Sequence, residues 1–369
     1  MKLNIGIVGA GNFASFAASA FIKVAGVNII AVTDINELAA RKLAMEMDAL
    51  VYTTYTNFLA DKNIDLVYIA TPPYLHYQQS KAALLTGKNV VCEKPAALNV
   101  ADAEELIAIA KASSLLYVVN LMQRYNPLFA IVKDVIDQKI FGNFLHGFFE
   151  NYASDENLDV QHWFWDAAKS GGIFIEHGVH FFDLFAGWLG DGKLLNAITI
   201  QRPGIKQTIV DRVQATVAYE RGIVNFYHGF DQPKILDRQE MRLQFDNGEI
   251  TLYEWIPVRM RLHGLLKNEQ LEKLQAMLQP CEILYQDKIS PTVQKVKGRF
   301  IDIIFDEHVT IEYGNNIDKQ NRYQQMLKVM LEDQWNWIKN HTHHRIIDEV
   351  NAVQSLLVAE QAQAIAIKI

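Results

Sequence analysis

Short apolar runs recur along the first third of the chain, with helix-like stretches between them. The runs are continuous and rich in β-branched residues, as in strands buried on both faces of a parallel sheet. They cover residues 3–8, 27–33, 64–71, 89–92 and 115–121, and the helical spacing lies at 15–24, 36–47, 76–86 and 100–113. This alternation predicts an α/β domain over residues 1–121, built on a doubly wound parallel sheet.

From Gly142 onward the pattern changes to long stretches in which apolar and polar residues alternate. Turn signals at Glu220–Gly222 and Asp246–Gly248 predict hairpins. Residues 267–300 are expected to be irregular, whereas 320–340 and 348–367 are expected to be helical. The pattern predicts a second, α+β domain over residues 122–369, with a large, mostly antiparallel open sheet packed on helices. An aromatic-rich face left open on such a sheet predicts a homodimer or homotetramer.

The first apolar run ends in GAGNFA, a GxGxxA pattern between a predicted strand and a predicted helix. The first glycine permits a tight turn, the second lets the backbone approach a pyrophosphate, and the alanine lets the helix pack closely. Helix N-terminal amides would then face the phosphates. The pattern is typical of a Rossmann NAD-binding domain, although small residues also suit close packing. The predicted cofactor contacts in this turn are Gly9, Ala10, Gly11, Asn12, Phe13 and Ala14.

The second predicted strand ends in Asp34, about twenty residues after the glycine turn, where a carboxylate can accept hydrogen bonds from ribose hydroxyls. A turn residue at a strand end is the alternative. A carboxylate at this place would repel a 2′-phosphate, and neither Ile35 nor Asn36 supplies a cation. The sequence therefore predicts NAD rather than NADP as the cofactor.

Composition and charge narrow the class of protein. Lysine and arginine number 35 against 42 aspartates and glutamates, a formal net charge of −7. This balance argues against nucleic acid or an anionic membrane as a partner. Two cysteines indicate neither a disulfide framework nor a zinc pattern. Because the chain begins with a strand pattern and has no apolar run of about twenty residues, we expect a cytoplasmic protein.

The stretch GGIFIEHGVHFFD, residues 171–183, places Glu176, His177, His180 and Asp183 in an apolar setting. Such groups are costly to bury without partners. At helical spacing Glu176, His180 and Asp183 share one face, so an acid could accept a ring N–H and fix the tautomer of His180. A bonded core network and a metal site are the alternatives. The two histidine rings diverge around the helix, which disfavours the metal site.

Four segments resemble the glucose–fructose oxidoreductase/inositol dehydrogenase/rhizopine-catabolism (Gfo/Idh/MocA) family of NAD(P)-dependent oxidoreductases. They are GIVGAGNFA from residue 6, IATPPYLHYQQSKAALLTGKNVVCEKPAAL from 69, VVNLMQRYNP from 118 and SGGIFIEHGVHFFD from 170. The resemblance implies that Lys94 lies beside the nicotinamide and touches the substrate hydroxyl, with Glu93 and Pro95 holding it. It implies further cofactor contacts at Thr71, Pro72, His76, Glu93, Lys94 and Gln123.

The resemblance also implies that Glu176 and His180 are a catalytic acid and histidine pair. The chain departs from the family pattern in three places. Glu176 stands where the family commonly has aspartate, His177 is an added polar group, and residues 163–166 read WFWD where relatives often carry Trp-Arg. The missing arginine weakens any assignment to an anionic substrate. Trp163 and Trp165 would suit stacking on a sugar-like ring, although core filling is the commoner role.

The sequence thus predicts a dehydrogenase that transfers a hydride between NAD and a sugar, polyol or inositol-like secondary alcohol, without a metal. His180 would take the hydroxyl proton, Glu176 would orient His180, and Lys94 would stabilise the alkoxide. Whether Lys94 or His180 is the base stays open, and Lys94, His177 and His180 are the predicted substrate contacts. The alternatives are a non-catalytic NAD-binding regulator, and a glycosidase or epimerase that keeps NAD tightly bound.

Overall fold

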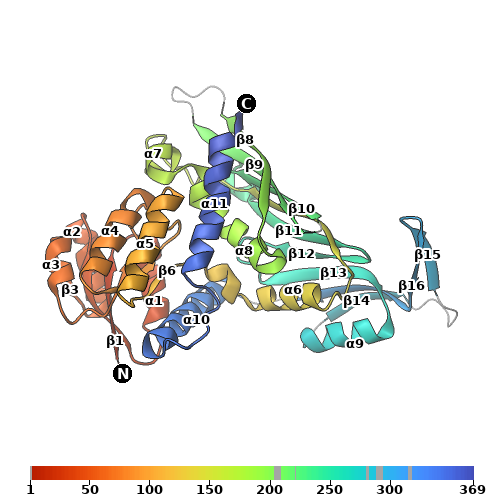
Figure 1. Ribbon diagram of the computed structural model, residues 1–369, viewed down its shortest axis with the longest axis horizontal. Coiled ribbons are helices and arrows are strands. Elements are labelled where there is room, and N and C mark those ends of the chain that lie inside the picture. Colours follow the sequence, from red (N-terminus) through yellow and green to blue (C-terminus); the bar gives the residue numbers. More distant parts are fainter. Residues whose placement is uncertain (1, 203–208, 221, 280–281, 288–293, 315–317) are drawn as a thin grey trace.

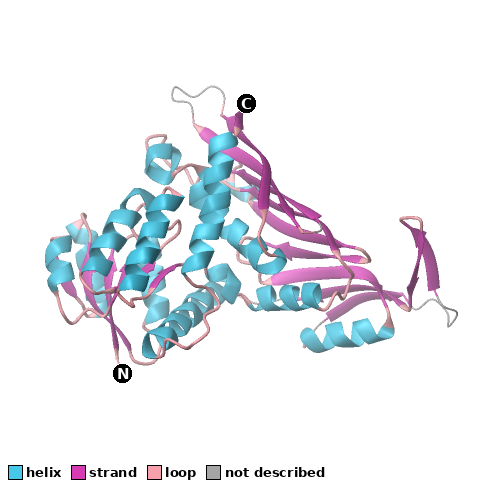
Figure 2. Ribbon diagram, viewed as in Figure 1, coloured by secondary structure: helices cyan, strands magenta, loops and turns pink. Residues whose placement is uncertain are grey.

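A computed structural model describes residues 2–202, 209–220, 222–279, 282–287, 294–314 and 318–369. Two sheets dominate these residues, one at each end of an elongated molecule (Figure 1). The sheet near the N-terminus has helices on both faces, whereas helices cover one face of the larger sheet (Figure 2). The predicted fold class, a doubly wound parallel sheet followed by a mostly antiparallel one, is confirmed.

Within the described residues, the first sheet has six parallel strands in the order β3-β2-β1-β4-β5-β6. This is the order of a dinucleotide-binding sheet, whose ligand crevice lies beyond the carboxyl ends of the strands. The strands are β1 (Leu3–Val8), β2 (Val27–Thr33), β3 (Leu50–Tyr52), β4 (Leu66–Ile69), β5 (Asn89–Cys92) and β6 (Tyr117–Val119). The helices are α1 (Asn12–Phe21), α2 (Glu37–Met47), α3 (Tyr55–Ala60), α4 (Pro73–Leu85) and α5 (Val100–Ala112).

The helix boundaries follow from local chemistry. Asn36 caps α2 by accepting hydrogen bonds from the backbone amides of Leu38 and Ala39, as a short polar side chain does at an N-cap. Helix α4 starts three residues earlier than predicted because proline fits the first helical turn, and Pro73 occupies it. The short β3 and α3 were not predicted, since three and six residues carry little periodic signal.

The second sheet has ten strands among the described residues, in the order β14-β17-β13-β12-β11-β7-β10-β9-β8-β18. Only the pairs β7–β10 and β8–β18 of these strands are parallel. The strands are β7 (Phe144–Tyr152), β8 (Lys193–Gln201), β9 (Val210–Tyr219), β10 (Gly222–Gly229), β11 (Arg238–Phe245), β12 (Gly248–Tyr253), β13 (Arg259–Leu266), β14 (Glu282–Asp287), β17 (Glu307–Tyr313) and β18 (Ile367–Lys368).

The hairpin predicted at Asp246–Gly248 is confirmed, because β11 and β12 pair antiparallel across it. Strands β9 and β10 also pair antiparallel, but Arg221 of the turn predicted between them lies outside the described residues. The expectation that residues 267–300 are irregular was wrong. This region contains α9 (Asn268–Met277), β14 and the first strand of a separate hairpin, β15 (Gln294–Gly298) with β16 (Ile301–Phe305).

Helical segments connect the two sheets and cover the inner face of the larger one (Figure 1). Helix α11 packs against α8 and against strand β8 of the second sheet. It also packs against α5 and strand β6 of the first sheet, while α10 packs on α1. The segments are η1 (Met122–Tyr125), α6 (Pro127–Asp137), η2 (Trp163–Trp165), α7 (Ala167–Ser170), η3 (Phe174–Gly178), α8 (Val179–Leu189), η4 (Lys234–Leu236), α10 (Lys319–Lys339) and α11 (Glu349–Ile365). The division of the chain at residue 121 stays a prediction.

In the ranges that the structure describes, no helix combines the length and the apolar character needed to cross a bilayer.

Candidate active site

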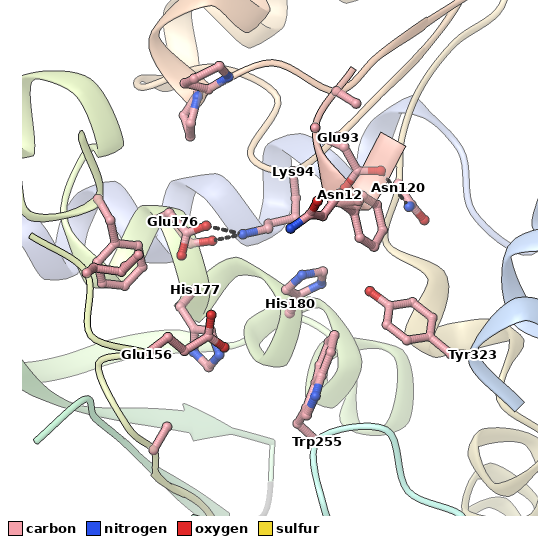
Figure 3. A pocket seen from close by; sticks show the side chains of 18 of the residues that line it. Asn12, Glu93, Lys94, Asn120, Glu156, Glu176, His177, His180, Trp255 and Tyr323 are labelled. Atoms are coloured by element: carbon pink, nitrogen blue, oxygen red, sulfur yellow. Dashed lines mark hydrogen bonds and ion pairs between the residues drawn. The ribbon is translucent and has the colours of Figure 1, made fainter. Parts of the chain in front are cut away.

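A cavity of about 2130 Å³ lies between the two sheets and is lined by both halves of the chain. On one side are the glycine turn and the residues that follow β2, β4 and β5. On the other are the η2 loop, η3, α8 and residues after β12. Figure 3 shows Lys94, Glu176, His177, His180 and Trp255 around this cavity. Predicted site residues on its wall are Gly9, Gly11, Asn12, Phe13, Asp34, Thr71, Pro72, Glu93, Lys94, Glu176, His177 and His180.

The glycine turn fits the phosphates of a dinucleotide. Gly9 has φ +91°, and a Cβ there would lie 2.6 Å from the carbonyl oxygen of Ala70, so glycine is required. A Cβ on Gly11 would point into open space, which leaves the backbone approachable from the cavity. Helix α1 begins at the next residue without a side-chain cap or an acid in its first turn. Its free amides can therefore receive an anion.

Asp34 lines the cavity at the end of β2 and is tied to the glycine turn. Its Oδ2 accepts a hydrogen bond from the backbone amide of Ala10 (2.6 Å), and its Oδ1 accepts one from the amide of Asn36 (2.6 Å). These bonds fix the carboxylate beside the turn. Ala10 and Ala14, also predicted as cofactor contacts, are buried and lie off the cavity wall, so their contacts with a cofactor stay a prediction.

The Glu93-Lys94-Pro95 segment leaves the end of β5 and is held from both sides. Glu93 accepts hydrogen bonds from the hydroxyl of Tyr68 (2.5 Å) and the side-chain amide of Asn120 (2.7 Å). Burial raises the pKa of Glu93, although these donors and Lys94 oppose the rise. The following peptide, Lys94–Pro95, is cis. The hydrogen bonds of Glu93 hold the loop that presents Lys94.

His76 and Gln123 do not reach the cavity wall and have other partners. The ring of His76 is buried between two backbone carbonyl oxygens, 2.7 Å from that of Pro95 and 2.7 Å from that of Thr71. It therefore braces the loop that carries Lys94. Gln123 is buried and donates to the backbone carbonyl of Trp255. Both residues position wall segments rather than contribute wall atoms themselves.

Lys94 is paired with Glu176 across the cavity (Figure 3). Its Nζ donates to the carboxylate of Glu176 and also to the backbone carbonyl of the same residue, 2.7 Å away. The expectation that Glu176 orients His180 is corrected by this pairing. Residues 174–178 form a π-helical turn, which is wider than an α-helical one, so side chains four positions apart no longer stack. Such turns are frequent at functional sites.

His180 lines the cavity, and the ring nitrogen that faces the protein interior has no hydrogen-bond partner among the described residues. Its Nδ1 is buried and unpaired among the described residues. Burial, and then the nearby Lys94 cation, lower the pKa of His180 well below its usual value. The ring is therefore neutral at working pH. A buried N–H without an acceptor costs more than a ring nitrogen without a donor, so we expect the proton of His180 on Nε2, where it can be donated to a ligand.

His177 also lines the cavity, and its side chain contacts a histidine of the large sheet. Its Nδ1 lies 2.9 Å from Nδ1 of His228 in β10. Burial, and then His228 and Lys94, lower the pKa of His177. His177 therefore has a hydrogen-bond partner, His228, that the sequence interpretation did not identify.

Asp183, grouped with Glu176 and His180 by helical spacing, faces a different partner. Its two carboxylate oxygens accept from Nε (2.9 Å) and Nη2 (2.8 Å) of Arg124, and its backbone carbonyl accepts from Nη2 as well (3.0 Å). Asp183 is almost completely buried. This bidentate pair ties α8 to η1 and lies outside the cavity wall.

Two aromatic side chains that the sequence interpretation did not include, Trp255 and Tyr323, also line the cavity. Tyr323 of α10 contacts Phe13 and Phe16 of α1, with ring centroids 5.9 and 4.9 Å apart, and Trp255 at 5.3 Å. Trp255 in turn lies 6.1 Å from His180. Trp163 and Trp165, for which both ring stacking and core filling were considered, line the cavity. In the described ranges, no three acidic, histidine or cysteine side chains gather to hold a metal.

Two family models match the chain. Residues 3–121 match the oxidoreductase family with an NAD-binding Rossmann fold, and residues 129–251 match the GFO/IDH/MocA C-terminal domain. The two matches together cover more than half of the chain and fall on the two sheets described above.

The sequence identity to individual relatives is low over most of the chain. The chain is 26% identical to "Oxidoreductase P35" of Formosa agariphila over 289 residues, 76% of this chain and 88% of that protein. It is 40% identical to a D-xylose 1-dehydrogenase (NADP(+)) of Hypocrea jecorina over 89 residues, 24% of this chain and 23% of the relative. The crystal structure of KijD10, a 3-ketoreductase from Actinomadura kijaniata in complex with NADP and TDP-benzene, shares the fold. It covers 100% of this chain and 99% of its own, with a TM-score of 0.76 at 16% identity.

Proposed function

The chain belongs to the Gfo/Idh/MocA family of oxidoreductases with an NAD(P)-binding fold, and from this premise we propose that it interconverts a secondary alcohol and a ketone on a sugar, polyol or inositol-like substrate with NAD. The observation that carries the proposal is that Lys94 and His180 line the same cavity as the glycine turn and Asp34. Ligands of doubly wound sheets bind at this edge.

The cofactor would be held by residues whose geometry fits it. The amides of Gly11, Asn12 and Phe13 at the start of α1 would bind the pyrophosphate, because those of Gly9 and Ala10 already donate hydrogen bonds within the protein. Asp34 would accept from the ribose hydroxyls. When bound, the nicotinamide supplies a hydride acceptor or donor. The cavity around it is large enough to hold a sugar-sized substrate as well.

Lys94 is assigned the proton exchange with the reacting oxygen. In the reductive direction its ammonium gives a proton to the oxygen that becomes a hydroxyl, and in the oxidative direction the proton returns to Nζ. Glu176 fixes the position of Nζ through two acceptors, its carboxylate and its carbonyl. Preorganised charge of this kind stabilises an oxygen on which negative charge develops.

His180 is assigned a hydrogen bond to the same oxygen rather than the role of base. A ring that is to accept a proton at Nε2 needs its other proton held at Nδ1, and the described residues offer Nδ1 no acceptor. Glu176, expected from the sequence to be that acceptor, holds Lys94. The Nε2–H donor and the Lys94 ammonium can then stabilise one oxygen together.

Two variants of His180 separate these roles. The H180Q amide can place a donor near the position of Nε2, whereas H180A removes it. We expect kcat of H180Q to stay within about threefold of the wild type and kcat of H180A to fall about tenfold, the typical worth of one hydrogen bond. NADH formation with D-xylose and myo-inositol measures both. Equal losses of about 10³-fold in both variants would identify His180 as the base.

The dehydrogenase itself is tested by the same assay with the wild-type protein and NAD over a wider panel of sugars and polyols. NADH that accumulates in proportion to substrate supports the proposal. Product formed without net NADH would instead indicate a tightly held cofactor that is reduced and reoxidised within one turnover. NAD binding without turnover of any member of the panel would indicate a regulatory binding protein.

Asp34 makes the cofactor preference testable. D34S removes the charge that opposes a 2′-phosphate, so we expect kcat/KM with NAD to fall about tenfold. The ratio of kcat/KM with NAD to kcat/KM with NADP should fall about a hundredfold. Asp65 provides a matched control because its carboxylate also accepts a backbone amide, that of Asn4, but lies off the cavity wall. D65S should leave the preference unchanged. An unaltered preference in D34S would refute the role of Asp34.

A further inference from the structure

The side chains of His177 and His228 form a part-buried hydrogen-bonded contact. The two Nδ1 atoms are 2.9 Å apart, a hydrogen-bond distance, so one of them donates and the other accepts. His177 lies in the π-helical turn and lines the cavity, whereas His228 is completely buried in β10. Burial lowers the pKa of His228 to about 3, so the pair is neutral at working pH.

The surroundings of His228 decide which of the two rings donates. Three phenylalanine rings, those of Phe149, Phe181 and Phe182, lie with centroids 5.1, 5.8 and 6.5 Å from it. Its Nε2 is buried and has no hydrogen-bond partner among the described residues. If His177 donated, His228 would have to carry its own proton on this Nε2, as an N–H without an acceptor. If His228 donates, its Nε2 is only a bare nitrogen.

The second arrangement is the cheaper one, because buried N–H groups without acceptors are rarer than acceptors without donors. It also settles the tautomer of His177. A ring that accepts at Nδ1 and is neutral must carry its proton on Nε2. Because Nδ1 is occupied by His228, Nε2 is the nitrogen with which His177 can meet a ligand.

We propose that His228 is a positioning residue that donates from Nδ1 to His177, and thereby fixes His177 as an Nε2–H donor to a substrate oxygen other than the one that exchanges its proton. The substrate part of this inference rests on the proposed function. It requires that the substrate have a second oxygen that accepts a hydrogen bond, such as a hydroxyl or ring oxygen of a sugar or polyol. The two donors, His177 and His180, would then each donate a hydrogen bond to a different oxygen on one face of the substrate.

The tautomers can be measured without substrate or cofactor. In the ¹⁵N-histidine-labelled wild-type protein, we expect one-bond N–H coupling at Nδ1 of His228 and Nε2 of His177, and a scalar coupling across the N–H···N bond that identifies the pair. H177Q and H228F assign the signals by their loss, and the cross-bond coupling assigns them if either variant does not fold. A proton on Nε2 of His228, or protons on both nitrogens of either ring, would overturn the proposal.

A pair of variants tests what His228 does for the substrate. H228N keeps a donor near the place of Nδ1, whereas H228F keeps an apolar ring among the phenylalanines but has no donor. In steady-state assays with D-xylose and myo-inositol, we expect H228F to raise KM about fivefold with kcat within twofold, and H228N to restore KM. Equal defects in both variants would show that His228 acts by packing alone. If the protein proves not to be a dehydrogenase, the NMR result stands independently.

Discussion

Replacing Lys94 by alanine is expected to lower kcat by about 10³-fold, some 4 kcal/mol in the activation barrier. Nζ is the cationic group that the structure holds on the cavity wall by two bonds to Glu176. Without it, the reacting oxygen loses both its proton partner and the charge that stabilises it. NAD affinity should change less than threefold, because the glycine turn and Asp34 are untouched. Stopped-flow measurement of NADH formation and calorimetric titration with NAD separate the two effects.

Strand β5 offers a matched control for this variant. Lys88 immediately precedes the strand and Lys94 follows it, so the two lysines lie at opposite ends of β5. Lys88 is buried and, like Lys94, donates two hydrogen bonds, here to the backbone carbonyls of Asp61 (2.6 Å) and Ile64 (2.9 Å). K88A should lower stability but not kcat. Turnover by K94A at the wild-type rate would remove Lys94 from the chemistry, and equal losses in K88A and K94A would point to a structural effect.

Removing the charge of Asp183 is expected to cost about 3–5 kcal/mol of unfolding free energy, the largest stability effect among these variants. D183N leaves the guanidinium of Arg124, 13% exposed, without the bidentate carboxylate that now compensates its burial. The loss is large because the cost of burying the cation persists after its partner is gone. Urea unfolding monitored by tryptophan fluorescence measures it, and NAD affinity should fall less than stability.

The control for D183N is an exposed ion pair of the same region. Lys133 and Asp137 are one turn apart on α6 and exposed by 38% and 53%. D137N should change the unfolding free energy by less than about 0.5 kcal/mol, as exposed pairs do. If D183N cost no more than D137N, the buried pair would not be what ties α8 to η1.

The first sheet could be predicted because its signals are local. Each strand except the short β3 is a continuous apolar run. The glycine turn sits where β1 meets α1, so one short segment specifies strand, turn and helix start. Glycine is needed at position 9 because its φ is positive and a Cβ there would collide with the backbone carbonyl of Ala70. The GxGxxA pattern signals such a tight turn between a strand and a helix. The position of Asp34 could likewise be predicted, because it directly follows β2, the strand next to the one that carries the turn. Its contact with a ribose stays a prediction.

The partners inside the site could not be predicted, because they depend on how turns are wound and on contacts across the fold. Helical spacing placed Glu176 over His180, but the π-helical turn directs Glu176 to Lys94 instead. His228 lies 51 positions after His177 and meets it only because β10 runs under η3. Neither residue gives a periodic or motif-like signal that would connect them.

Helix α10 has a consequence for how the protein is made. Phe13 and Phe16 lie near the beginning of the chain, yet the ring that covers them, Tyr323, belongs to a helix synthesised some three hundred residues later. While translation proceeds, the nascent nucleotide-binding half therefore exposes an aromatic patch beside its own ligand turn. These two rings stay without that cover until α10 has been made and packs on α1.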